Sequence, residues 1–432
     1  MKANDTTTMG CGLGVLLCLV LSSPSDAQES KVIVLENADS LVGLVIDGED
    51  ARELIGNVRV RQGNVHIACD RALQMLARGT VFLDGEVVLR DDSVTISAPR
   101  AVYHRDGREA EAYDGVSLDD GRAVLTARTG RYLIDSGSAF FVTDVVVEDS
   151  TSTVRADSLT YLRPESRALG FGHVAVHSKT DDVTIFGGHL DHRASGGFSR
   201  MTRMPILVQR DTSAPGGADT LVVRSKVMES YRDSLRRFVA MDSVRIVRSD
   251  LAAVAETATF FMEGDSLHLR GSPVIWYGET QVTGDVADIY LEDRRLRQMR
   301  VSGDAFTISR GDSAYPDRLD HLTADTLGLF FEEGKIVRVQ ADRRATSVYH
   351  IYEDSLANGL NKSSGDRILM DFDEGRVSSI TIIGGVEGQY VPEPLVRHSI
   401  QEYRVPGFRW REDRPTMDMT GWPWKNIEQA NR

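Results

Sequence analysis

The feature that most constrains this chain is a short strand pattern that recurs at a nearly constant spacing. In each copy an alternating apolar stretch leads to a small residue, a polar residue and a second alternating stretch, as in VTISAPRAVY over 94–103. The small residues, spaced by 29, 29, 29 and 31, are Cys69, Ala98, Ala127, Ala156 and Gly187. Self-similarity of this kind predicts an array of stacked units.

A second column of residues runs in step with the first. Turn-forming residues precede short strands at spacings of 29, 30, 29 and 28, at Gly56, Gly85, Gly115, Asp144 and Gly172. The later copies have longer spacings of 29, 40 and 41, between Ala255, Gly284, Ala324 and Gly365. Two independent columns with one period make a chance match improbable.

Every copy is predicted to be a β-strand, because β-branched and aromatic residues alternate with charged ones. A strand with one apolar face cannot bury that face alone, so the copies must stack. The residues expected to point inward are Val58, Val60, Val65, Ile67, Val94, Ile96, Leu125 and Val154. The predicted fold is all-β, an elongated open β-jellyroll or β-solenoid of stacked repeats of about 29 residues.

The pattern also predicts how the chain is organised. Residues 1–27 have the apolar run and small-residue end of a cleaved signal peptide. A first block covers 32–205, a linker 206–220 with a Pro-Gly-Gly centre, and a second block 221–391. The remaining residues, 392–432, form a tail rich in Pro and Trp, for which a docking segment, a cap and a disordered end all remain open.

Composition and chemistry exclude several functions. The formal net charge of −14 gives no basic face for nucleic acid. The mature chain would retain one cysteine, Cys69, which falls in an alternating apolar run and is expected in the core. Neither the zinc spacings nor the nucleophile-elbow and phosphate-loop motifs occur, so we expect no metal, no cofactor and no catalysis.

One column of acids could be mistaken for a metal or catalytic row. Its members are Asp70, Asp157, Glu256, Asp285, Asp325 and Asp366. Pro99, Arg128 and Gly188 interrupt it. Carboxylates of turn residues that face solvent are therefore the preferred interpretation.

The stretch 32–89, with its ELIGNVRVRQGNVHIACDRAL segment and the recurrent strand, Ala-Asp and Gly-x-Val unit, resembles the OstA-like family. That family comprises periplasmic lipopolysaccharide-transport proteins of the LptA type and the soluble N-terminal domains of their outer-membrane partner. The resemblance covers nearly all of the mature chain, but this chain is much longer than LptA.

The resemblance implies an open β-jellyroll that carries lipid A acyl chains in a hydrophobic groove, here formed by the eight inward residues. It implies head-to-tail joining by edge-strand pairing, with inner-membrane and outer-membrane components at the two ends and self-association as an option. The expected function is therefore a periplasmic, lipopolysaccharide-binding bridge between the two membranes. A structural or adhesive secreted β-solenoid with a closed, dry core is the alternative.

Overall fold

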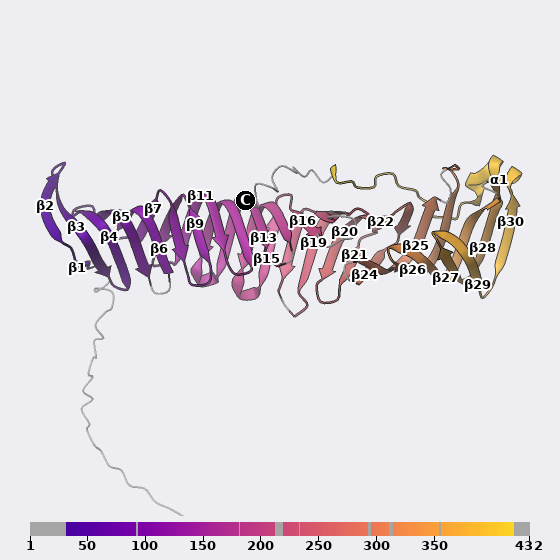
Figure 1. Cartoon of the computed structure of the whole chain (residues 1–432), viewed down its shortest axis with the longest axis horizontal. Coiled ribbons are helices and arrows are strands. Elements are labelled where there is room, and N and C mark those ends of the chain that lie inside the picture. The colour runs from indigo at the N-terminus through magenta and orange to yellow at the C-terminus, as the bar shows by residue number, and fades with distance from the viewer. Residues whose placement is uncertain are drawn as a thin grey trace, which may run out of the picture.

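The computed structural model describes residues 32–418, apart from 92–93, 181, 212–218, 233, 293–294, 311–313 and 354–355. The expected signal peptide, 1–27, lies outside these residues. In the described part thirty strands form one antiparallel sheet, and the molecule is long and narrow (Figure 1). The predicted fold class, an elongated all-β jellyroll, is confirmed. No helix of the described residues is long and apolar enough to span a membrane.

The strands of the N-terminal half are β1 (Val34–Asn37), β2 (Ser40–Ile46), β3 (Glu49–Gln62), β4 (Val65–Met75), β5 (Thr80–Asp91), β6 (Val94–His104), β7 (Glu109–Tyr113), β8 (Val116–Asp119), β9 (Val124–Ala127), β10 (Thr129–Leu133), β11 (Ser138–Glu148), β12 (Ser152–Leu162), β13 (Arg167–Ser178), β14 (Val183–Arg193), β15 (Phe198–Thr202) and β16 (Ile206–Asp211).

The strands of the C-terminal half are β17 (Asp219–Arg224), β18 (Val227–Tyr231), β19 (Arg237–Val247), β20 (Leu251–Phe261), β21 (Ser266–Arg270), β22 (Val274–Tyr277), β23 (Thr280–Thr283), β24 (Val286–Glu292), β25 (Arg295–Arg310), β26 (Leu319–Glu332), β27 (Lys335–Glu353), β28 (Leu356–Asp373), β29 (Arg376–Ile383) and β30 (Glu387–Pro392). The helix α1 (Glu393–Ser399) follows, and then the 3-10 helix η4 (Ile400–Tyr403).

The strands bend near their middle, and this bend divides the sheet into two layers. In β5, residues 80–84 pair with 71–75 and 100–104, whereas 87–91 pair with 65–68 and 94–98. We call the layer that contains 80–84 layer 1 and the layer that contains 87–91 layer 2. Buried residues of both layers form one hydrophobic cluster, so the inner faces pack against each other. The hairpin turns lie on the side opposite the bend, which we call the open side.

The residues at the bend explain the second sequence column. Gly85 has φ +75° and the following Glu86 has φ +44°, and the register shifts between Asp84 and Val87. A Cβ on Gly85 would overlap the carboxylate of Asp70 on the neighbouring strand. The column was expected to mark turns between strands. For Gly56, Gly85, Asp144 and Gly172 it marks bends within strands. Left-handed residues, a pair at the first three positions and Gly172 alone at the fourth, turn the strand without ending its pairing.

The stretch expected to be a linker contributes two strands to the sheet. β16 pairs with β14 on one side and with β17 on the other, so the described residues 206–211 and 219–220 belong to the hydrogen-bonded ladder. Ile206 and Val208 are buried on the face opposite to Leu207, which lies in the interior. Apolar residues on both faces anchor β16 here. The Pro-Gly-Gly segment lies outside the described residues.

The described part of the tail packs along the outer face of layer 2. Val405 joins a cluster with Phe306, Ile308 and Leu319, and Met417 packs against Ile206 and its neighbours. Gln281 donates a hydrogen bond to the carbonyl of Arg409 (2.9 Å) and accepts one from the N–H of Arg411 (2.8 Å). In Figure 1 this segment runs back from α1 toward the middle of the molecule. Residues 404–418 are therefore a docked strap.

Candidate functional site: the apolar interior between the two layers

A continuous row of apolar side chains lines the inner face of layer 2. Its members are direct cross-strand neighbours, from Val60, Ile67, Leu89, Ile96, Leu118, Leu125, Val147 and Val154 to Val176, Ile185, Leu207, Val223, Ile246, Ala253, Ile275 and Val282. The row then meets the buried polar side chains Thr307 and Ser347. An apolar inner surface therefore extends over sixteen strands of layer 2, with one residue of the row on each strand.

All eight residues predicted to line a groove lie on this face of layer 2. Seven are buried in one cluster, namely Val58, Val60, Val65, Ile67, Val94, Ile96 and Leu125. Val154 is partly exposed and packs against the other large cluster of the molecule.

Sequence reasoning missed the opposite wall, which layer 1 supplies. Its inner row runs through Leu83, Ala101, Ala112, Gly130 and Phe141. These residues alternate as regularly as those of layer 2. Across the bend the alternation keeps its phase in β5, from Leu83 to Val87, and shifts by one residue in β6, from Ala98 to Ala101. A signal existed in the sequence, because apolar residues alternate on both sides of a bend, as Val81, Leu83, Val87 and Leu89 do in β5.

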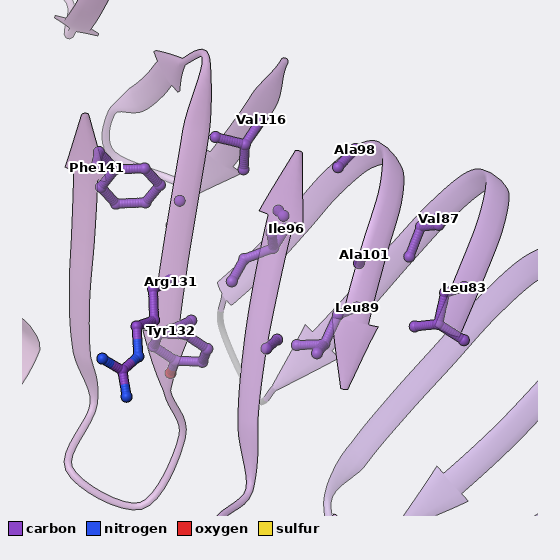
Figure 2. Close-up of a pocket in the computed structure, with 13 residues that line it drawn as sticks. Leu83, Val87, Leu89, Ile96, Ala98, Ala101, Val116, Arg131, Tyr132 and Phe141 are labelled. Carbon is purple, nitrogen blue, oxygen red and sulfur yellow. The ribbon is translucent and has the colours of Figure 1, made fainter. Parts of the chain in front are cut away.

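The interior of the N-terminal half is filled by side chains. A cavity of about 20 Å³ lies between Leu83, Leu89, Ile96 and Tyr132 (Figure 2). A single water needs roughly 10–15 Å³ of such space. The cavity therefore has room for about one water, and an acyl chain can enter only if side chains or layers move apart.

Three polar bridges join the rims of the two layers on the open side, and we call them the rim bridges. The hydroxyl of Tyr103 donates to Gln62 (2.7 Å), that of Tyr132 to Asp91 (2.8 Å) and that of Tyr161 to Asp120 (3.1 Å). Both partners advance by 29 residues from one bridge to the next. The rim bridges thus close the open side once per repeat along the N-terminal half.

The first two rim bridges are buried. Gln62, Asp91, Tyr103 and Tyr132 are each at most 3% exposed. Burial raises the pKa of Tyr103 to about 12, so its hydroxyl stays protonated and donates. Arg163 lies at the rim as well, with Nη1 3.3 Å from the Tyr132 hydroxyl and 3.5 Å from Asp91.

The third bridge lies at the edge of a less covered region. Tyr161 is only partly buried, and burial followed by the nearby Asp120 raises its pKa. Beyond it, aliphatic side chains of the inner face are partly exposed at Val147, Val154, Val176, Val183 and Ile185. We call these five residues the exposed inner stretch. They belong to β11–β14, where the two large hydrophobic clusters meet.

The thiol of Cys69 and possible metal ligands are the groups that could give the interior a chemical function. Cys69 is buried at the inner face, its thiol lies 3.3 Å from the carbonyl of Arg71, and burial raises its pKa to about 11. A thiol in this state is protonated and packs as a small apolar group. Within the described residues no group of three or more His, Cys, Asp or Glu side chains could hold a metal ion. The acids of the column lie at the bend, where Asp70 and Asp157 cover Gly85 and Gly172.

Comparisons with known proteins give few matches. No family model matches the sequence, and no curated protein matches it. Among solved structures, the chain is similar to LptH from Pseudomonas aeruginosa, the LptA homologous periplasmic component of the conserved lipopolysaccharide transport device. The match has 15% sequence identity and a TM-score of 0.26, and it covers 33% of this chain and 95% of LptH.

Proposed function

We propose that this protein carries the acyl chains of an amphipathic lipid between its two layers and performs no catalysis. The observation that carries the proposal is the unbroken apolar row of layer 2, from Val60 to Val282. Moving an acyl chain from water to such a surface gains about 0.8 kcal/mol per buried CH₂ group. A row that crosses many strands offers the same environment at each step, so a chain can move along it without a large barrier.

Lipopolysaccharide is the lipid we propose, with the periplasm as the compartment and a bridge between inner and outer membrane as the role. The ends of the described sheet support a bridge, since β1 and β2 pair only with β3, and β29 and β30 only with β28. Apolar side chains are exposed at both ends, including Leu41 and Val45 at one and Ile383 and Tyr390 at the other. Transport components or a second copy could pair with these edges.

A structural role is the second candidate, and the small cavity favours it. The N-terminal interior holds room for about one water, as a closed and dry solenoid would. The two candidates differ in what happens when lipid is present. A carrier separates its layers to admit acyl chains, whereas a structural solenoid keeps its side chains in contact.

The test is photocrosslinking followed by mass spectrometry of the attached lipid. A photoreactive residue replaces Ile185, which is partly exposed on the inner face. The matched control replaces Thr184, the outward-facing neighbour of similar exposure. Recovery of lipopolysaccharide or lipid A from position 185 and not from 184 is expected. Absence of lipid from position 185 in a folded, β-rich protein would leave the structural role.

A further inference from the structure

The interior is covered unevenly along its length. In the N-terminal half, inner residues of layer 2 such as Val65, Val94 and Leu125 are at most 4% exposed. From β16 onward Leu207 and Val223 are buried again. Between these parts, at the exposed inner stretch of β11–β14, five aliphatic residues of the inner face of layer 2 are partly open to solvent.

The next position in the series of rim bridges explains why this region is open. Asp149 follows Asp120 by 29 residues, and His192 takes the place of the tyrosine. Asp149 accepts hydrogen bonds from Thr151 (2.6 Å) and Ser152 (2.7 Å), and Nδ1 of His192 lies 2.9 Å from the Ser199 hydroxyl. Both groups are thus held within their own layers, and no hydrogen bond joins them across the open side.

The residues of layer 1 in the same row change character along the chain. Before the exposed inner stretch they are tyrosines paired with alanines, and at it they are Ala168, His192 and Ser199. After Ser230 the row continues with Phe238 and Phe260, which fill the space. Small and polar side chains therefore occupy this row of layer 1 opposite the exposed inner stretch, in place of the tyrosines and phenylalanines on either side.

Arginine side chains lie at the layer 1 rim near these small and polar residues. Arg232 stands next to the turn at Gly197, and its charge, after burial, helps to lower the pKa of His192. Arg232 and Arg236 are exposed and form no ion pair with any described residue.

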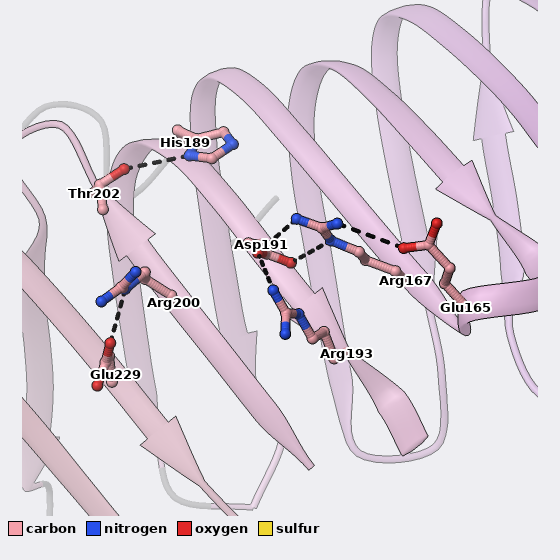
Figure 3. A network of polar contacts seen from close by, with 8 residues as sticks. All are labelled: Glu165, Arg167, His189, Asp191, Arg193, Arg200, Thr202 and Glu229. Atoms are coloured by element: carbon pink, nitrogen blue, oxygen red, sulfur yellow. Dashed lines mark hydrogen bonds and ion pairs between the residues drawn. The ribbon is translucent and has the colours of Figure 1, made fainter. Parts of the chain in front are cut away.

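The acids on the outer face nearby are already paired (Figure 3). Asp191 accepts two hydrogen bonds from Arg167 at 2.9 Å and one from Arg193 at 3.3 Å, and Arg200 binds Glu229 at 2.7 Å. Although burial alone would raise the pKa of Asp191, these arginine contacts lower it, so the carboxylate stays charged and paired. Arg232 and Arg236 are therefore two rim arginines that have no ion pair to a described residue, on a chain whose net charge is −14.

We propose that the exposed inner stretch is a lateral entry port, through which the acyl chains of a phosphorylated glycolipid enter while Arg232 and Arg236 hold its phosphate. The proposal rests on the proposed function. Arginine suits this task because its guanidinium forms two parallel charge-assisted hydrogen bonds to a phosphate. The rim bridges set the N-terminal limit of the port and Phe238 and Phe260 its C-terminal limit.

The test uses lipid A with two phosphates and monophosphoryl lipid A as probes of the whole mature chain. The two-phosphate form is expected to bind about tenfold more tightly, the effect of one added charge-assisted contact. Replacing both Arg232→Gln and Arg236→Gln should reduce that ratio below about threefold, whereas Arg59→Gln, an exposed and unpaired arginine of β3, should leave it unchanged. An unchanged ratio in the double variant would overturn the phosphate assignment.

The position of entry is tested by the time course of photocrosslinking. Label should attach first at position 185 and at least about fivefold more slowly at position 96, since Ile96 lies behind the rim bridges. Tyr161→Phe, which opens the partly exposed third bridge, should speed labelling at position 96. If label attaches at equal rates to positions 185 and 96 in the protein that retains Tyr161, the entry port is overturned and lipid carriage is retained. Absence of label at every inner position would instead reject the proposed function.

Discussion

At the scale of single residues, the rim bridges concentrate the cost of opening the interior in a few buried groups. Tyr132 is 3% exposed and Asp91 is 2% exposed, and the bond between them is 2.8 Å long. Tyr132→Phe removes the donor and leaves a buried carboxylate short of one partner. We expect a loss of about 1–3 kcal/mol in the free energy of unfolding.

Urea unfolding measures this loss, and Tyr113→Phe is the matched control. The Tyr113 hydroxyl also donates to an acid, Glu111, but at a partly exposed site within one strand. Its removal should cost less than about 0.5 kcal/mol. If both variants lose the same stability, the bridge between the layers has no special weight.

His321 makes docking of the strap depend on pH. Its Nδ1 lies 3.0 Å from the carbonyl of Leu319, and its Nε2 accepts a hydrogen bond from the N–H of Val405 at 3.2 Å. This arrangement needs a neutral ring, and burial lowers the pKa of His321 to about 4. An unfolded histidine titrates near 6.5, so the unfolded chain binds the proton first as the pH falls. Stability is therefore lost between about pH 6.5 and 4, by up to roughly 3 kcal/mol.

Unfolding in urea at a series of pH values tests this, with His321→Gln as the comparison. Glutamine keeps a donor and an acceptor but does not titrate, so its stability should fall less over the same range. The nearby Asp320 has a pKa raised by burial and is hydrogen-bonded to His350. That pair is present in both proteins, so their difference isolates His321. Parallel pH profiles would contradict the assignment.

At the scale of elements, the bend converts a flat meander into two facing layers, and its glycines are the costly positions. Gly85→Ala places a side chain at φ +75° and against Asp70. Gly48→Ala meets the same backbone constraint at φ +79° but has open space around it. The left-handed conformation alone costs about 1–2 kcal/mol, so Gly85→Ala should lose more than that and Gly48→Ala about that much.

Thermal and urea unfolding of the two variants separate the two contributions. Equal losses would mean that Asp70 moves aside freely and that the bend tolerates a side chain. A larger loss at Gly85 would show that the acid column and the glycine column are packed together. The comparison also tests whether the acids of this column recur because they pack against the glycines at the bend, and not because they bind a metal.

Strands and their alternation could be predicted from the sequence, but the bend could not. Period-two alternation identified the inner residues of layer 2, such as Val65 and Ile96, because that rule is local. The partners of layer 1 could not be assigned, since pairing across the interior depends on where each strand bends. Tyr132 and Asp91 are 41 residues apart, and only their shared 29-residue recurrence hinted at a contact. The docking of the strap was equally hidden, because its apolar residues show no period.

At the scale of the whole molecule, the described interior is divided into two hydrophobic clusters that meet at β12. Leu159 belongs to the N-terminal cluster and Ala156, on the same strand, to the C-terminal one. This division lies before the expected linker at 206–220 and coincides with the exposed inner stretch. In a stacked array each unit contacts mainly its neighbours, so a weakly filled region separates cooperative units.

The two clusters are therefore expected to unfold as separate units. Leu125→Ala, in the N-terminal cluster, and Leu269→Ala, in the C-terminal one, each remove a side chain at most 4% exposed. Each should cost about 2–5 kcal/mol, but only in its own unit. Hydrogen-exchange mass spectrometry in increasing urea resolves the two halves by peptide. Leu125→Ala should lower the midpoint for peptides of β3–β10 and leave those of β19–β28 unchanged, and Leu269→Ala should do the reverse. A common shift of all peptides would show one cooperative core, in which case the partly exposed residues of β11–β14 would not weaken the coupling between the halves.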